Sequence, residues 1–136
     1  MIRVLAVDDE PMVCAHLRTI LGSSGDIEVV AEAHDGLEAL TQIDAVRPDV
    51  VLLDLRMPGL DGLGALDRIA ARPDPPVVVV LTTFDADEHV LRALHAGAIG
   101  FLVKSTPPED LIQLVRVAAE GHTVLSPAAA RRLIAA

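Results

Sequence analysis

The alternation of apolar and polar stretches along the chain predicts an α/β fold. Five apolar runs have the length of strands, and stretches with helical periodicity separate them. Runs such as VVLL and VVVVL are apolar on both faces, which is typical of parallel strands covered by helices on each side. The predicted strands span residues 2–7, 27–33, 50–53, 77–81 and 100–103. We therefore expect a five-stranded, doubly wound parallel sheet with helices on both faces.

Turn and cap residues divide the chain between these strands. Three predicted helices start with an N-cap residue that is followed three positions later by glutamate, the spacing of a capping box. These pairs are Asp35 with Glu38, Asp85 with Glu88 and Thr106 with Glu109, and Pro107 and Pro108 suit a first helical turn. We expect one domain over residues 1–121. Residues 122–136 are expected to start a linker toward an effector domain that this chain lacks, and Ser126 to open a short helix.

The composition excludes some classes of function. A formal net charge of −9 disfavours binding to phosphate backbones, and a chain with two Phe and no Trp or Tyr offers no stacking surface for bases. Cys14 is the only cysteine, so no internal disulfide forms. The apolar runs are too short to cross a bilayer. We expect a soluble, cytoplasmic protein with no membrane partner.

Polar side chains follow four of the five predicted strands. Asp8 and Asp9 follow the first strand, and Asp54 follows the third. Thr82 follows the fourth and Lys104 the fifth, whereas the second strand contributes nothing comparable. Groups at the carboxyl ends of parallel strands meet at one edge of a doubly wound sheet. If the first and third strands are neighbours, three carboxylates meet there beside a hydroxyl and an ammonium group.

This set of side chains suits phosphoryl transfer. Crowded carboxylates repel one another unless a cation lies between them, so replacing Asp8 by a neutral residue should stabilise the metal-free protein. Oxygen ligands without His or Cys favour Mg²⁺. Aspartate can act as a nucleophile that forms an acyl phosphate, and a metal ion with a lysine supplies positive charge to the phosphoryl oxygens. The acids therefore predict an Mg²⁺-dependent aspartate phosphorylation site.

Four motifs resemble the receiver domain of two-component response regulators. They are VDDE at 7–10, DLRMPGLDG at 54–62, LTT at 81–83 and GFLVK at 100–104. Their order and spacing cover residues 1 to about 121. The stretch TTFDADEHVLRALHAGAIGFLVK is similar to the subfamily that carries LuxR-type helix-turn-helix effectors. The resemblance implies a flavodoxin-like sheet with the strand order 2-1-3-4-5.

The resemblance also implies how the acids act. Asp54 would accept a phosphoryl group from a sensor histidine kinase, in a self-catalysed transfer rather than as a turnover enzyme. Asp9 and Asp54 would bind Mg²⁺ directly, Asp8 would bind it through water, and Arg56 would offer its backbone carbonyl. Dephosphorylation would likewise be the domain's own activity.

A conformational switch is implied by the same resemblance. Thr82 and Lys104 would contact the phosphoryl oxygens, and Phe101 matches the aromatic switch position and would move inward. The output would be control of a DNA-binding transcriptional effector, reached only through the absent helix-turn-helix domain. A phosphorylation-dependent homodimer would form through the first and fifth helices. Many receivers have a proline after the lysine, often with a cis bond, whereas Ser105 stands here and a cis bond would cost about 3 kcal/mol.

Several of these residues are also compatible with simpler roles or with a different chemistry. An isolated acidic pair is most often a solvated strand end or a helix cap, and Phe101 can simply pack in the core. A hydrolase of the haloacid dehalogenase type usually has a second Asp two residues after its nucleophile, where this chain has Arg56. A receiver-like module that no longer uses phosphate would not need Asp9, Asp54 and Lys104. No G-x-G-x-x-G follows the first strand, which excludes dinucleotide binding by that motif.

Overall fold

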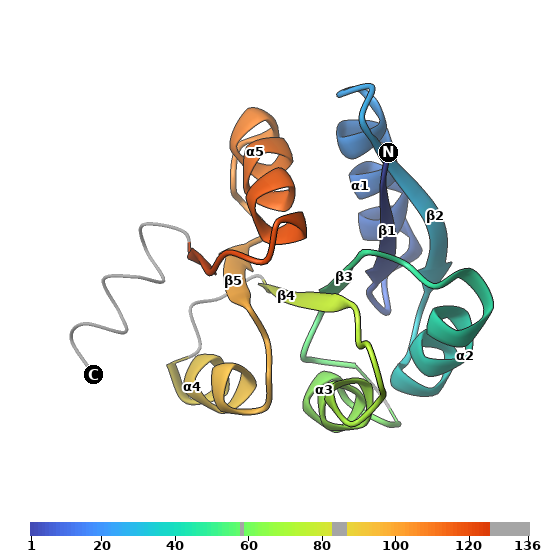
Figure 1. Ribbon diagram of the computed structural model, residues 1–136, viewed down its shortest axis with the longest axis vertical. Helices are drawn as coiled ribbons and strands as arrows, with labels where there is room; N and C mark the ends of the chain where they lie inside the picture. Colours follow the sequence, from blue (N-terminus) through green and yellow to red (C-terminus); the bar gives the residue numbers. More distant parts are fainter. Residues whose placement is uncertain (58, 83–86, 126–136) are drawn as a thin grey trace.

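A computed structural model describes residues 1–57, 59–82 and 87–125, with the side chains of 82 and 87–90 left undescribed. Strands and helices alternate along the chain (Figure 1). The strands are β1 (Ile2–Val7), β2 (Ile27–Ala33), β3 (Val50–Leu53), β4 (Val77–Thr82), β5 (Gly100–Val103) and β6 (Val124–Leu125). The helices are α1 (Pro11–Gly22), α2 (Gly36–Val46), α3 (Gly62–Ala70), α4 (Asp87–His95) and α5 (Pro108–Ala119).

The strands form one parallel sheet in the order β2-β1-β3-β4-β5-β6. The predicted strand order is confirmed for the first five strands. β1 and β3 pair directly, with Val7 opposite Leu53, so the residues that follow these two strands lie next to each other. The order in space reverses beside β1, the kind of position where α/β sheets bind their ligands.

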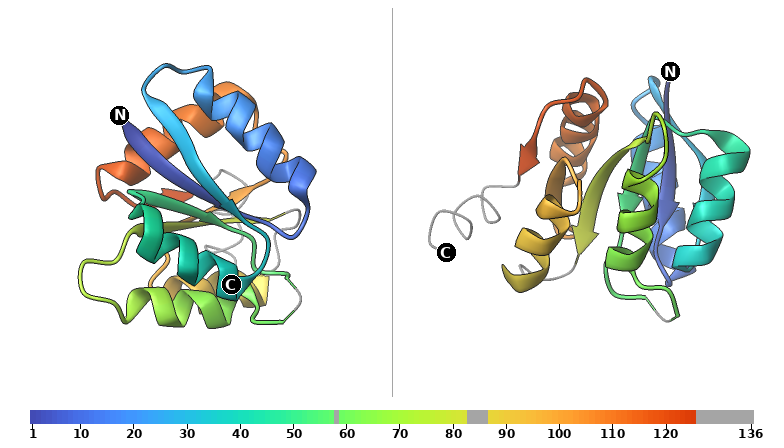
Figure 2. Two further views of the ribbon diagram at one scale, coloured as in Figure 1. Left: turned by 90° about the vertical axis from the view of Figure 1, so that its right-hand side faces the viewer. Right: turned by 60° about the horizontal axis from the view of Figure 1, so that its bottom comes forward.

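Helices cover both faces of the sheet, and two separate cores result. Views from two directions show α1 and α5 on one face and α2, α3 and α4 on the other (Figures 1 and 2). Along β1, Val4 and Ala6 pack toward α1 and α5, whereas Leu5 and Val7 pack toward α2 and α3. This alternation follows from the two-residue period of a strand. Within the described ranges no helix is long and apolar enough to cross a bilayer.

Two helix starts test the predicted caps. Asp35 caps α2 as expected, since its side chain accepts a hydrogen bond of 2.8 Å from the backbone N–H of Glu38. The predicted capping box at Thr106 is wrong: α5 starts at Pro108, and the Thr106 hydroxyl donates to the Val103 carbonyl instead. The adjacent prolines delay the helix because Pro108 suits only its first turn. Asp85 and Ser126 lie outside the described residues.

A short sixth strand extends the sheet where the sequence predicted the start of a linker. Val124 and Leu125 pair with Gly100 and Phe101 of β5. A side chain at Gly100 would collide with the carbonyl group of Val124, so the glycine permits this close pairing. Two apolar residues are too short a pattern to predict a strand. The predicted domain boundary at residue 121 remains a prediction.

Gly62 couples α3 to the loop that follows β3. It is the first residue of the helix, and its backbone N–H donates to the Leu55 carbonyl over 3.1 Å. A Cβ built on Gly62 would collide with the Asp54 carbonyl oxygen and with Cα of Leu55. Both colliding atoms belong to the backbone, which cannot move aside as a flexible side chain can. The position of Asp54 therefore depends on the lack of a side chain at Gly62.

We expect Gly62→Ala to destabilise the fold by about 2–3 kcal/mol, the usual cost of forcing atoms into a packed site. Gly22→Ala is the matched control. Gly22 is the last residue of α1 and has no atom within 4 Å of a built Cβ, so alanine should stabilise the helix by about 0.5 kcal/mol. Urea unfolding of the three proteins measures both effects. Equal stability of the two variants would contradict the proposed crowding at Asp54.

Candidate functional site

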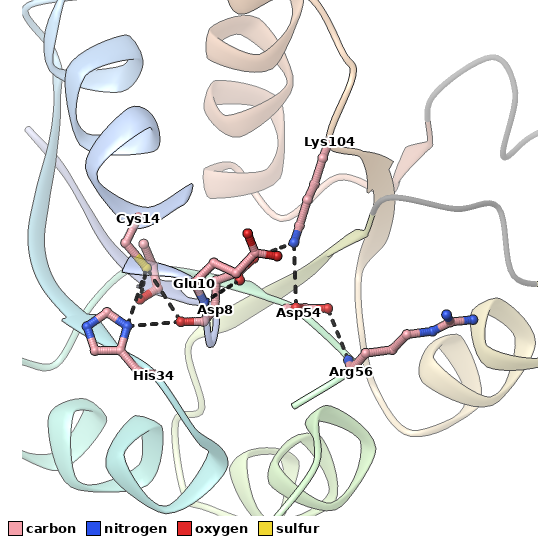
Figure 3. Close-up of polar contacts among 8 residues, drawn as sticks. Asp8, Glu10, Cys14, His34, Asp54, Arg56 and Lys104 are labelled. Carbon is pink, nitrogen blue, oxygen red and sulfur yellow. Dashed lines mark hydrogen bonds and ion pairs between the residues drawn. The ribbon is translucent and has the colours of Figure 1, made fainter. Parts of the chain in front are cut away.

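Three charged side chains meet at the carboxyl edge of the sheet. Asp8 directly follows β1, Asp54 directly follows β3 and Lys104 directly follows β5 (Figure 3). The main chains of the first two are joined as well, because the N–H of Asp54 donates to the Val7 carbonyl over 3.0 Å. The structure thus brings together three of the side chains that the sequence predicted would meet, those of Asp8, Asp54 and Lys104.

Lys104 is shared between the two carboxylates. Its Nζ lies 2.5 Å from Oδ2 of Asp8 and 3.5 Å from Oδ2 of Asp54. The side chains of Asp8, Asp54 and Lys104 are only 2%, 7% and 16% exposed. In the part of the chain that the structure describes, Asp8 and Asp54 are the only polar residues that are buried. Buried charges are costly unless they are paired, and here one ammonium group serves two acids.

Burial changes the acidity of these groups. Burial raises the pKa of Asp54, and the nearby charges of Asp8 and Asp9 act in the same direction, against the Arg56 amide and the Lys104 charge. Burial alone would lower the pKa of Lys104, but its hydrogen bond to Asp8 and the charge of Asp54 outweigh this and raise it. Lys104 therefore stays protonated, and ionised Asp54 costs stability.

Carboxylate oxygens from three consecutive residues could hold a cation. One oxygen each from Asp8, Asp9 and Glu10 lie within 4.8 Å of one another. Asp9 and Glu10 are exposed, whereas Asp8 is buried. Asp54 is not part of this group, but it and Asp8 both contact Lys104. These ligands are hard oxygen donors and outnumber the single ammonium group, so the set fits Mg²⁺. Glu10 was not among the predicted ligands.

Three further residues were predicted to belong to the site, namely Arg56, Thr82 and Phe101. The backbone N–H of Arg56 donates to Oδ1 of Asp54 over 3.0 Å, while its guanidinium points away from the acids (Figure 3). Thr82 ends β4, but its side chain lies outside the described part of the chain. Phe101 is 1% exposed and already lies inside the core in this structure, and its role as a switch residue stays a prediction. The peptide bond between Lys104 and Ser105 is trans.

Two residues near Asp8 were missed from the sequence. Nδ1 of His34 lies 2.9 Å from the Asp8 carbonyl oxygen, and Sγ of Cys14 lies 3.9 Å from the same oxygen (Figure 3). Nothing comparable was recognised after the second strand in the sequence, so His34, which reaches this edge, was overlooked. His34 follows β2 directly, so the rule that identified the other strand-end residues would have identified it too.

The contact between Lys104 and Asp8 changes the expectation that a neutral residue at Asp8 would stabilise the metal-free protein. Asp8 has the closer contact with Lys104, so Asp8→Asn removes a favourable interaction and should lower the melting temperature in a chelator. Asp54→Asn should raise it, because the pKa of Asp54 is raised by burial and its ionised form is disfavoured. A gain of about 1 kcal/mol corresponds to a rise of about 4 °C in a chain of this size.

The sign of the pH dependence follows from the raised pKa of Asp54. Its penalty grows as the pH rises from the ordinary pKa of an aspartate toward the raised folded-state pKa, is complete above the latter, and vanishes below the ordinary pKa, where the carboxyl is protonated in both states. The advantage of Asp54→Asn should therefore be present at neutral pH and disappear in acid. Calorimetric melts in a chelator at several pH values measure it. An advantage that is independent of pH would show that ionisation is not the cause.

The chain is similar to known proteins along most of its length. Residues 4–116 match the family model described as the response regulator receiver domain. The nitrate/nitrite response regulator protein NarL of Escherichia coli K12 is 38% identical over 125 residues, which cover 92% of this chain and 58% of NarL. This chain thus spans about three fifths of that relative.

Two solved structures extend the comparison. The receiver domain of a putative response regulator NarL from Mycobacterium tuberculosis is 37% identical with a TM-score of 0.84, covering 89% of this chain and 98% of that one. A LuxR-family two-component response regulator from Aurantimonas sp. SI85-9A1 is 31% identical with a TM-score of 0.92, covering 98% and 95%. The chain belongs to the response regulator receiver domain family, with relatives among regulators of the NarL and LuxR families.

Proposed function

We propose that this chain accepts a phosphoryl group from a sensor histidine kinase on Asp54 and passes the signal on as a change of conformation. The observation that carries the proposal is the shared contact of Lys104 with Asp8 and Asp54 at the carboxyl edge of the sheet. The match to the receiver family supports it. A buried carboxylate beside a permanent positive charge can attack phosphorus and then have its new negative charge stabilised.

In the proposed reaction an Asp54 carboxylate oxygen forms a bond to phosphorus, and the bond from phosphorus to the kinase histidine breaks. Oδ1 of Asp54 is held by the Arg56 N–H, and Oδ2 faces Lys104. Lys104 then contacts the transferred phosphoryl oxygens, together with Thr82. Asp8, Asp9, Asp54 and the Arg56 carbonyl would hold Mg²⁺, which would supply further positive charge to the same oxygens.

The output that we propose is control of transcription. The relatives NarL and LiaR are named as a nitrate/nitrite response regulator and a transcriptional regulatory protein, and both are longer than this chain. Phosphorylation would rearrange the region of α4 and α5, with Phe101 as the aromatic switch residue. DNA would be bound only by a helix-turn-helix domain that follows residues 122–136. The same site would account for autodephosphorylation.

A hydrolase with an Asp nucleophile is the second candidate for this site. Such an enzyme needs a further acid near the leaving group, and the position two residues after Asp54 holds Arg56, whose guanidinium points away from the acids (Figure 3). A binding module without phosphate chemistry is the third. It would gain nothing from burying Asp54, whose ionised form burial disfavours.

Incubation with acetyl phosphate and Mg²⁺ tests the proposed acceptor. Wild type should gain at most one phosphoryl group per chain, as measured by intact-protein mass spectrometry. Asp54→Asn should gain none, because the amide cannot form an acyl phosphate. Asp67→Asn is the control, since Asp67 is an exposed acid of α3 and should be labelled like wild type. Labelling of Asp54→Asn at the wild-type yield would refute the assignment, and multiple turnovers of a phosphate ester would favour the hydrolase.

A groove between α1 and the start of α5 is the proposed contact surface of a phosphorylation-dependent homodimer. It has a volume of about 530 Å³, and its lining includes Met12, His16 and Pro108. Met12 is 83% exposed and adds apolar surface to the groove. Val117 on α5 is partly buried against the core, so a charge there would test folding as much as association. His16 is exposed and lines the groove, which makes it the better test position.

Sedimentation with and without the phosphoryl mimic beryllofluoride measures this association. Wild type should dimerise when the mimic is bound, and His16→Glu should stay monomeric because it places a negative charge in an apolar contact. We expect its affinity for the partner to fall at least about tenfold. The control is Thr41→Glu on the exposed face of α2, away from the groove. Normal dimerisation of His16→Glu would exclude the groove as the interface.

A further inference from the structure

The main chain of Asp8 is held on both sides by the end of β2. Its N–H donates to the Ala33 carbonyl over 3.0 Å, and its own carbonyl oxygen lies 2.9 Å from Nδ1 of His34. A carbonyl oxygen can only accept, so Nδ1 must carry the proton and donate. Figure 3 shows the imidazole reaching this oxygen from the β2 side. His34 therefore ties the loop after β1 to the neighbouring edge strand.

We propose that His34 is a positioning residue, whose hydrogen bond fixes the Asp8–Asp9 peptide and so the direction in which both carboxylates face the cation. The proposal rests on the proposed function and deepens it. A peptide group is planar, so holding the Asp8 carbonyl also fixes the N–H of Asp9 and the start of that residue. Rotation of this peptide would turn the Asp9 side chain away from its neighbours.

The Asp8 side chain cannot supply this restraint by itself. Its Oδ1 accepts a 2.9 Å hydrogen bond from the N–H of Glu10, and its Oδ2 contacts Lys104. Both contacts orient the carboxylate relative to Cβ but leave the carbonyl group to other donors. Among the described residues, a second donor near that carbonyl is Cys14, at 3.9 Å, and a thiol is a weak donor. Loss of the imidazole would thus leave the peptide poorly held.

A nucleophilic pair of Cys14 and His34 is the alternative interpretation of this contact. Sγ of Cys14 lies 4.0 Å from Nδ1, but that nitrogen already donates to the Asp8 carbonyl. Cys14 is fully buried, and burial raises its pKa to about 11, so the thiol stays neutral and unreactive. Its hydrogen can point to the Ala6 carbonyl, 3.7 Å away. The geometry therefore favours a role for His34 in orienting Asp8 and not in activating sulfur.

Two substitutions separate the donor from the bulk of the ring. His34→Asn keeps an N–H donor near the place of Nδ1, whereas His34→Leu fills similar space without a donor. His122→Leu, at an exposed histidine beyond α5, is the control for the change of residue type. The readout is Mg²⁺ affinity, measured by titration of the backbone amide NMR signals of Asp9 and Glu10. Melting curves of each variant report its stability separately.

We expect His34→Leu to weaken Mg²⁺ binding about tenfold, the lower end of the effect of losing a group that orients a metal ligand. His34→Asn should stay within about twofold of wild type, as should His122→Leu. The Mg²⁺ concentration that gives half-maximal labelling by acetyl phosphate should shift in parallel, with little change in the maximal rate. Unchanged affinity in His34→Leu, or equal weakening in His34→Leu and His34→Asn, would overturn the proposal.

A measurement on wild type keeps the proposal testable even if His34→Leu fails to fold. Long-range ¹H–¹⁵N spectra of the imidazole identify which nitrogen of neutral His34 carries the proton. Protonated Nδ1 supports the hydrogen bond to Asp8, and protonated Nε2 overturns it. If wild type shows neither Mg²⁺ shifts nor labelling of Asp54, the proposed function fails and the positioning role fails with it. Equal Mg²⁺ affinity in wild type and in His34→Leu would contradict the positioning role and leave the proposed function intact.

Discussion

The contact of one lysine with two buried carboxylates constrains the rest of this structure. Asp8 and Asp54 leave β1 and β3, which pair directly, whereas Lys104 leaves β5, with β4 between. Only a long side chain can reach past the end of β4, and the flexible four-carbon stem of lysine does so. The order of strands thus decides which acids become neighbours, and the length of one side chain decides how they are neutralised.

The two acids are built into their loops in the same way. Oδ1 of Asp8 accepts the N–H of Glu10, and Oδ1 of Asp54 accepts the N–H of Arg56, in each case two residues further along the chain. Such contacts are typical of Asx turns. In both acids Oδ2 is the oxygen that approaches Lys104. One oxygen of each carboxylate therefore holds the backbone of its loop, and the other faces the ammonium group of Lys104.

The fold and most of this edge could be predicted because buried parallel strands have a simple pattern. The four-residue run 50–53 is apolar throughout, and it ends where a charge appears at Asp54. The strand β6 could not be predicted, since its two residues pair only because Gly100 lacks a side chain. The position of His34 at the end of β2 can be predicted from the sequence, but its hydrogen bond cannot. It ends on a backbone carbonyl, and a sequence pattern does not show where carbonyl groups point.

The charges at this edge bear on the proposed phosphorylation. The carboxylates of Asp8, Asp9 and Glu10 lie close together, and Asp8 shares one ammonium group with Asp54, so the unmodified site already has excess negative charge. In the proposed function a phosphoryl group adds more, and the modified state persists only while cations balance it. Lys104 would then have to divide its charge between Asp8 and the phosphoryl oxygens. If the contacts of Lys104 with the phosphoryl oxygens differ between two conformations of the domain, the phosphoryl group stabilises one conformation more than the other. Such a difference is what shifts a conformational equilibrium.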